Sequence, residues 1–202
     1  MKIKYYENDL PTNLDLGNIV GIDTETMGLN PSRDRLCLIQ LSSGNGVCHL
    51  LKIIDLKKRP KNLIKLLLNK KIKKIFHFAR FDVAVLKHTY NIDLKNLYCT
   101  KIASKLVRTY TDKHGYKDLC KELLNKTISK TEQSSDWGSK LTKEQKKYAA
   151  TDVLHLHAIK KRLDIMLERE NRVNIANACF EFISHRTDLD LYGWQDIDIF
   201  KH

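Results

Sequence analysis

The chain has few of the residues that interrupt or divide a polypeptide. Of its 202 residues, 3 are proline and 8 are glycine, and neither type gathers into a linker. Internal repeats and low-complexity segments are absent as well. This length suits one domain with a full hydrophobic core and is too short for two comfortable ones. The sequence therefore predicts a single domain.

Cysteine is scarce and scattered. The five residues are odd in number, and no two of them form a Cys-x-x-Cys pair. Most stand inside apolar runs such as RLCLIQL and NACFEFI. This pattern predicts buried free thiols in a reducing compartment and argues against a zinc site.

Long hydrophobic runs are missing too. The N-terminal segment MKIKYYENDLPTNLD lacks the apolar core of a signal peptide. The longest apolar stretches fall far short of the ~20 residues that cross a bilayer. We expect no membrane segment and a cytoplasmic protein.

Basic residues outnumber acidic ones. The chain has 36 Lys and Arg against 24 Asp and Glu, a net charge of +12 and a pI near 9.4. Such a balance favours polyanionic partners, because cations that neutralise phosphates release counterions. A lysine-rich but merely solvated surface is the alternative. The charge supports nucleic acid as a partner without establishing it.

Apolar runs and turn residues predict an α/β fold with a mixed sheet. The expected strands are 18–24, 36–42, 46–51 and 74–78, with a Ser-Gly-Asn-Gly hairpin turn between the second and third. A crossover helix is expected to open at Pro60. Further helices are expected over 82–90, 99–109, 115–125 and 142–170, the last with a capping box formed by Thr142 and Gln145.

Residues 171–202 differ in character from the body at 1–170. From Glu181 onward the segment is acidic and rich in aromatic and apolar side chains, on an otherwise basic protein. We expect this partly irregular extension to pack on the body or on a neighbouring subunit.

Acidic residues recur in three separated motifs. Asp23 and Glu25 stand in GIDTETMGL, Asp82 in HFARFDVAVL, and Asp152 in KYAATDVLHL, four residues after Tyr148. Residues two apart on a strand share a face, and so do residues four apart on a helix. We therefore expect the carboxylates to meet, with the Tyr148 phenol beside them.

Each motif alone has an ordinary explanation: Asp23 can end a strand, Asp82 can cap a helix, and Tyr148 can pack. Together, in apolar contexts where an unpaired carboxylate is costly, they favour a metal site. Oxygen ligands suit Mg²⁺ or Mn²⁺, and two such ions about 3.5–4 Å apart can cleave a phosphodiester. Tyr148 is expected to orient the attacking water or help deprotonate it.

The motif order resembles the DEDD superfamily of 3′–5′ exonucleases, in its tyrosine subclass. The histidine subclass would have His where Lys147 stands. Two stretches are similar to ribonuclease D-like proteins: HGYKDLCKELLN at 114–125 and KTEQSSDWGSKLTKEQKKYAATDV at 130–153. Others resemble the compact alphaproteobacterial nanoRNase C type: RDRLCLIQLSSG, KIFHFARFD, CTKIASKLVRTYTDKHG and LDLYGWQDIDIF. One departure is His77, where many relatives have Asn.

The resemblance implies an RNase H-like (DnaQ-like exonuclease) fold, a mixed sheet flanked by helices. It implies two Mg²⁺ or Mn²⁺ ions held by Asp23, Glu25, Asp82 and Asp152, and release of nucleoside monophosphates from 3′ ends of very short RNA, chiefly dinucleotides. It also implies a homo-oligomer, with octameric rings in the closest branch. Longer ribonuclease D proteins append helical domains, for which a chain ending at residue 202 has no room.

Candidates for substrate contact flank these motifs. Met27 and Leu29 resemble an apolar wedge against terminal bases, or pack the strand end. Lys101, Lys105 and Arg108 are spaced as one helical stripe, suited to phosphates or to solvent. The loop of Ser134, Ser135, Asp136 and Trp137 suits a terminal phosphate, unless Trp137 is a structural plug. The candidates are Thr24, Met27, Leu29, His77, Phe78, Arg80, Lys101, Arg108, Ser135 and Trp137.

Other functions remain open from the sequence. A general ribonuclease D-like enzyme would trim the 3′ ends of structured RNA, and a DNA exonuclease would need the same carboxylates. A catalytically silent nucleic-acid-binding module would explain the positive charge, but the intact acidic set argues against it. Sugar preference depends on contacts to the 2′-OH that no motif here specifies.

Overall fold

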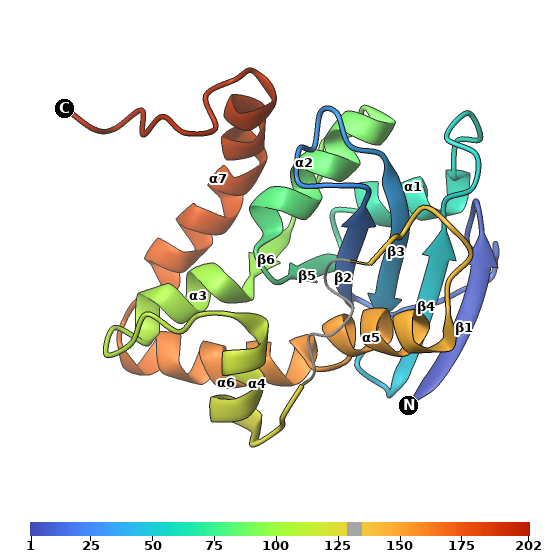
Figure 1. Cartoon of the computed structure of the whole chain (residues 1–202). Coiled ribbons are helices and arrows are strands. Elements are labelled where there is room, and N and C mark those ends of the chain that lie inside the picture. Colours follow the sequence, from blue (N-terminus) through green and yellow to red (C-terminus); the bar gives the residue numbers. More distant parts are fainter. Residues whose placement is uncertain (129–134) are drawn as a thin grey trace.

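The computed structural model of the chain describes residues 1–128 and 135–202. Its centre is a six-stranded sheet in the order β1-β4-β3-β2-β5-β6 (Figure 1). The strands span Lys2–Glu7 (β1), Ile19–Thr26 (β2), Leu36–Ser42 (β3), Val47–Lys52 (β4), Lys73–Phe76 (β5) and Leu97–Cys99 (β6).

The sheet is mixed, as predicted. β3 runs antiparallel to β2 and β4, whereas β1 is parallel to β4, and β5 is parallel to both β2 and β6. Every residue of β3 is buried, so this strand lies in the middle of the core. In the β3–β4 turn, Gly44 and Gly46 have φ of 77° and 81°, which explains the glycines of the predicted hairpin.

Helices cover both faces of the sheet (Figure 1). α5 packs across β1 to β4, while α2 packs on β2, β3, β5 and β6 and carries α7 on its outer side. The helices span Lys61–Leu68 (α1), Ala79–Tyr90 (α2), Thr100–Val107 (α3), Tyr116–Leu124 (α4), Lys143–Leu154 (α5), Leu156–Arg169 (α6) and Val173–Leu191 (α7).

The predicted helix ends are confirmed in part. Pro60 stands directly before α1, and the capping box of Thr142 and Gln145 opens α5. The prediction of a single helix over 142–170 is wrong, because the helix is interrupted at His155, between α5 and α6. Asp82 does not start its helix either; α2 begins three residues earlier, which leaves Asp82 in the first turn.

Two strands were not predicted. β1 is an edge strand with mostly exposed side chains, so its sequence KIKYYE shows no clear apolar alternation. β6 has only three residues. Both are held by pairing with a neighbouring strand rather than by a sequence pattern of their own.

The C-terminal extension consists largely of the 19-residue helix α7, followed by an irregular end. Phe180 and Ile183 of α7 belong to the same buried core as the sheet. Acidic residues of α7 pair with α2, as in the contacts of Arg80 with Asp190 and Lys87 with Asp188. A domain boundary at residue 170 and contact with a second subunit stay predictions.

Among the described helices, none has both the length and the apolar character to cross a bilayer. The cytoplasmic location stays a prediction. The described cysteines carry free thiols, four buried and one, Cys179, exposed.

Candidate active site

Three predicted carboxylates meet beside the sheet. Asp23 and Glu25 lie on one face of β2, and Asp152 comes from α5. One carboxylate oxygen of each lies within 4.8 Å of the others. The fold thus brings carboxylate oxygens from residues up to 129 positions apart in the chain close enough to bind one metal ion.

Gly21 permits this approach of helix and strand. A Cβ atom at this position would lie 3.1 Å from Leu156 Cδ1 and 3.2 Å from the carbonyl oxygen of Val153. Both residues belong to the junction of α5 and α6, immediately after Asp152. The absence of a side chain on β2 therefore lets the helix carry Asp152 to the carboxylates two and four residues further along the strand.

Gln40 on β3 stands opposite Asp23 in the antiparallel register. Its Nε2 donates to Asp23 Oδ2 at 3.1 Å and to Glu25 Oε1 at 3.4 Å. The sequence reasoning missed this residue. The available signal was a single amide in the otherwise apolar strand LCLIQLS, where a buried polar side chain needs partners.

Asp82 lies apart from the cluster of three in this structure. Its side chain is buried and accepts a 2.7 Å hydrogen bond from the Thr24 hydroxyl. Thr24 sits between Asp23 and Glu25 but points to the opposite side of β2. Thr24 therefore ties the first turn of α2 to the strand that carries two of the acids, and its predicted contact with substrate stays a prediction.

The carboxylates are electrostatically strained. Burial raises the pKa of Asp23 to about 7. Burial and the charges of Asp23, Asp152 and Asp82 raise the pKa of Glu25 to about 10. Burial also raises the pKa of Asp82 well above its usual range. Negative groups gathered in this way are stabilised by bound cations.

The donor set fits a hard divalent cation. All of the converging side-chain groups are carboxylate oxygens, which suit Mg²⁺ or Mn²⁺ rather than metals that prefer nitrogen or sulfur. Buried carboxylates without hydrogen-bond donors on every oxygen are otherwise costly. The residues present therefore match the metal site that the sequence predicts.

Tyr148 lies one helical turn before Asp152 on α5 and is half-buried. Its ring packs on that of Trp137, with ring centroids 6.1 Å apart. Trp137 is only 2 % exposed, as expected for a structural plug. Its carbonyl accepts a hydrogen bond from the buried Lys52 Nζ, which also bonds the Gly138 carbonyl at 3.2 Å. Ser135 belongs to the same predicted loop as Trp137, and its contact with a terminal phosphate stays a prediction. Ser134 lies outside the described residues.

A pocket of about 300 Å³ opens over the carboxylates. It contains four of the predicted substrate contacts, and it adds Tyr116, Lys117 and Ile128, which the sequence reasoning did not single out. The lining residues are Asp23, Thr24, Glu25, His77, Phe78, Lys101, Gly115, Tyr116, Lys117, Ile128, Tyr148 and Asp152.

Phe78 forms one wall of this pocket in an unusual backbone conformation. Its φ is 64°, in the left-handed region that bulky residues rarely adopt, and its side chain is 43 % exposed. Lys101 Nζ lies 4.2 Å from the centre of the Phe78 ring. Strain of this kind is often found at functional sites, and here it presents an aromatic face and a cation to the pocket.

His77 is oriented by its neighbours. The Thr100 hydroxyl lies 2.9 Å from His77 Nδ1 and has its own acceptor in the Phe76 carbonyl at 3.2 Å. The imidazole also packs on Tyr116, with ring centroids 5.7 Å apart.

The remaining candidates lie outside the pocket lining. Met27 and Leu29 are exposed, to 54 % and 89 %, just beyond the end of β2. Arg80 points to the C-terminal segment, where it bonds Asp190 at 2.7 Å and the Gln195 carbonyl at 2.5 Å. Their contacts with substrate stay predictions.

The predicted stripe of three cations is wrong in its geometry. α3 ends at Val107, so Arg108 follows the helix and turns inward. Its fully buried side chain bonds Glu122, the Ser104 hydroxyl at 2.9 Å and the Lys113 carbonyl at 2.6 Å. Those contacts occupy the guanidinium, and the geometry does not favour its predicted role in substrate binding.

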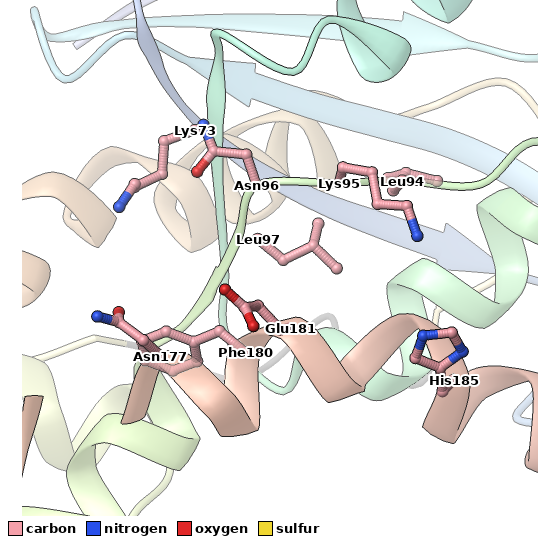
Figure 2. A pocket seen from close by; sticks show the side chains of 9 residues that line it. All are labelled: Lys73, Leu94, Lys95, Asn96, Leu97, Asn177, Phe180, Glu181 and His185. Atoms are coloured by element: carbon pink, nitrogen blue, oxygen red, sulfur yellow. The ribbon is translucent and has the colours of Figure 1, made fainter. Parts of the chain in front are cut away.

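A larger hollow of about 550 Å³ lies elsewhere, between the segment that leads into β6 and helix α7 (Figure 2). Leu97 and Phe180 both line it, together with Lys73, Lys95, Glu181 and His185. Because it contains none of the converging carboxylates, its size does not make it the site of hydrolysis.

Comparison with known proteins identifies the family of the chain. A family model for 3′-5′ exonucleases matches residues 7–168. The chain is similar to ribonuclease D of Nitrobacter hamburgensis, with 31 % identity over 158 residues, which cover 76 % of this chain and 40 % of that protein. The chain thus spans about two fifths of the length of the curated ribonuclease D relatives it matches.

Two solved structures of Brucella melitensis NrnC extend over the whole chain. NrnC with bound Mg²⁺ is 50 % identical, with a TM-score of 0.95 and coverage of 100 % of both chains. NrnC bound to pGG is 51 % identical, with a TM-score of 0.96 and coverage of 100 % of this chain and 99 % of that one. The mixed sheet and its helices therefore have the RNase H-like exonuclease fold. This chain belongs to the 3′-5′ exonuclease family, in the ribonuclease D-like branch that includes NrnC.

Proposed function

We propose that the protein is a metal-dependent 3′–5′ exoribonuclease that hydrolyses very short RNA, chiefly dinucleotides, to nucleoside 5′-monophosphates. The observation that carries this proposal is the convergence of Asp23, Glu25 and Asp152 beneath the pocket. Asp82, held by Thr24, completes the acidic set that the motif order predicts. Membership of the exonuclease family supports the same reaction.

Asp23, Glu25, Asp82 and Asp152 would hold two Mg²⁺ or Mn²⁺ ions, which when bound supply a nucleophilic water and stabilise the leaving oxygen. The Mg²⁺ bound to NrnC supports the choice of metal. Tyr148, one turn before Asp152 and packed on Trp137, would hold the attacking water through its hydroxyl. The partly exposed Phe78 ring offers a stacking face for a base, and Lys101 a charge for a phosphate.

The size of the pocket supports a short substrate. Its volume of about 300 Å³ is at the lower end of the ~300–1,000 Å³ that is typical of small-molecule sites. NrnC has been solved with pGG, which points to the same class of ligand. We therefore favour RNA fragments of two nucleotides over long or structured RNA.

The decisive experiment measures Mn²⁺-dependent hydrolysis of 5′-labelled RNAs from two nucleotides upward. We expect rapid loss of the dinucleotide, slow attack on longer chains, and no hydrolysis by Asp23→Asn. Asp112→Asn, which changes an exposed acid outside the pocket, is the matched control and should remain active. Ca²⁺ in place of Mn²⁺ should bind while supporting little turnover.

Other outcomes would identify the alternatives. Progressive shortening of long RNA, with dinucleotides left behind, would make the protein a ribonuclease D-like trimming enzyme. Faster hydrolysis of the matching DNA oligonucleotides would make it a DNA exonuclease. Binding without hydrolysis under any divalent cation would make it a silent binding module.

The proposal includes a homo-oligomer, for which octameric rings in related proteins are the precedent that the resemblance supplies. The exposed apolar side chains at the end of the chain support it: Tyr192, Trp194 and Phe200 are 76 %, 46 % and 79 % exposed. Light scattering after size-exclusion chromatography measures the mass directly. A monomer at micromolar concentration would refute this part of the proposal.

A further inference from the structure

A tyrosine interrupts the helical hydrogen bonding next to Asp152. In a continuous helix the amide of His155 would donate to the carbonyl of Thr151, four residues earlier. Here the Tyr116 hydroxyl bridges the two groups instead: it donates to the Thr151 carbonyl at 2.8 Å and accepts from the His155 amide at 3.2 Å. The same amide also donates to the Val153 carbonyl. Side chains inserted in this way bend or break helices. The insertion coincides with the end of α5 and the start of α6.

Tyr116 reaches this junction from the first residue of α4. Its side chain is buried, lines the pocket and packs on His77. Burial, with smaller contributions from Cys120 and Asp152, raises the pKa of its phenol well above the usual range. The phenol therefore stays protonated at neutral pH and keeps both the donor and the acceptor that the inserted geometry requires.

The junction is constrained from a second side by the sheet. Val153 and Leu156 stand directly over Gly21 of β2, where even a methyl group would be crowded. Asp152 lies between Thr151, whose carbonyl Tyr116 binds, and Val153, whose carbonyl faces Gly21. Contacts on both neighbouring residues therefore constrain the backbone at Asp152.

We propose that Tyr116 is a positioning residue: its hydroxyl keeps the α5–α6 junction open and thereby places the Asp152 carboxylate for metal binding. This role rests on the proposed function in one respect: it assumes that the metal site is the one used for hydrolysis. Without the hydroxyl, the Thr151 carbonyl loses its donor, and the His155 amide can turn from the Val153 carbonyl to the Thr151 carbonyl. The helix then continues through residue 155 and rotates Asp152 away from Asp23 and Glu25.

The test is Tyr116→Phe, which keeps the ring and removes the hydroxyl. Because the two freed backbone groups can bond each other, the melting temperature in EDTA should stay within a few degrees of wild type. Mn²⁺ affinity, measured by electron paramagnetic resonance titration without substrate, should fall tenfold or more. The amide of His155 should exchange more slowly with solvent, as expected for a regular helical hydrogen bond.

Tyr90→Phe is the matched control. The Tyr90 hydroxyl is also buried and has no hydrogen-bond partner among the described residues, and it lies at the far end of α2. This variant should bind Mn²⁺ as wild type does. If both variants lose affinity equally, a general effect of removing a buried hydroxyl explains the result and the proposed role is refuted.

Two further results would overturn the inference. Unchanged Mn²⁺ affinity in Tyr116→Phe would mean that the hydroxyl does not position Asp152. A variant that fails to fold would contradict the re-pairing of the two backbone groups. If wild type binds Mn²⁺ but hydrolyses no RNA, the proposed function fails, while the affinities of the two variants still decide the role of Tyr116.

Discussion

The Thr24 hydroxyl donates a 2.7 Å hydrogen bond to the carboxylate of Asp82, 58 residues further along the chain. Thr24 stands on β2 between the two acids that face the pocket, and Asp82 stands in the first turn of α2. This contact fixes the fourth predicted carboxylate relative to the other three. It has a direct consequence for catalysis.

We expect Thr24→Val, which preserves the shape of the side chain, to lower kcat about ten- to a hundredfold. Loss of a hydrogen bond to a buried charged group costs ~1.5–3 kcal/mol, and a change of 1.36 kcal/mol in the barrier is tenfold in rate. Thr24→Ser retains the hydroxyl and should keep most of the activity. Steady-state kinetics on a dinucleotide compares the three proteins, and equal loss in both variants would contradict a role for the hydrogen bond.

Lys52→Met should slow hydrolysis about three- to tenfold while leaving Mn²⁺ affinity unchanged. Lys52 holds the carbonyls of Trp137 and Gly138, and Trp137 packs on Tyr148, which is not among the metal ligands. A red shift of Trp137 fluorescence in a Trp194→Phe background would report the loosened loop. Lys74→Met is the control, since Lys74 is also buried and bonds a carbonyl, that of Asn69, away from the pocket. A similar loss of rate in the control would attribute the effect to lost stability.

Gly21→Ala should reduce both stability and Mn²⁺ affinity. The new methyl group would lie 3.1 Å from Leu156 Cδ1 and 3.2 Å from the Val153 carbonyl, and overpacking of this kind typically costs ~1–3 kcal/mol. Adding Leu156→Ala removes the shortest of the three close contacts, that with Leu156 Cδ1, and should recover part of the Mn²⁺ affinity. Thermal unfolding and Mn²⁺ titration of both variants check this, and wild-type behaviour of Gly21→Ala would refute a close approach at the junction.

The metal-free protein should become less stable as the pH rises. Burial raises the pKa of Asp23 from 3.8 to about 7, so the folded state holds this proton more tightly than the unfolded state. The associated stability is complete below the unfolded pKa and is lost as the pH rises through about 7. We expect the melting temperature in EDTA to fall between about pH 5 and pH 8, and Mn²⁺ to restore it by binding the ionised carboxylates.

Asp23→Asn separates the two effects. The variant removes one of the charges that burial disfavours, so at pH 8 in EDTA it should melt at a higher temperature than wild type, yet gain little from Mn²⁺. Scanning calorimetry with and without metal makes the comparison. A metal-free wild-type protein with the same melting temperature at pH 5 and pH 8 would show that the acidic cluster is not strained.

Much of the fold and site follows from local sequence. The strands at β2, β3 and β4, the hairpin glycines and the capping box of Thr142 and Gln145 depend on neighbours in the chain, and each was predicted. β1 and β6 were missed because pairing with distant strands, rather than their own pattern, makes them strands. The long helix was predicted as one because the residue that breaks it, Tyr116, stands 39 positions before His155.

The sequence by itself determined which residues are proposed to carry the chemistry. Carboxylate spacing on one strand and on one helix, and the order of the motifs, predicted a site of Asp23, Glu25, Asp82, Tyr148 and Asp152 without any knowledge of their contacts. Only the tertiary structure decided how the acids are held: Gln40 donates to Asp23 and Glu25, and Thr24 donates to Asp82. It also decided that Arg108 turns inward, although its spacing predicts an exposed stripe. Periodicity describes the faces of one element, whereas burial and hydrogen bonding depend on what packs against that face from elsewhere in the chain.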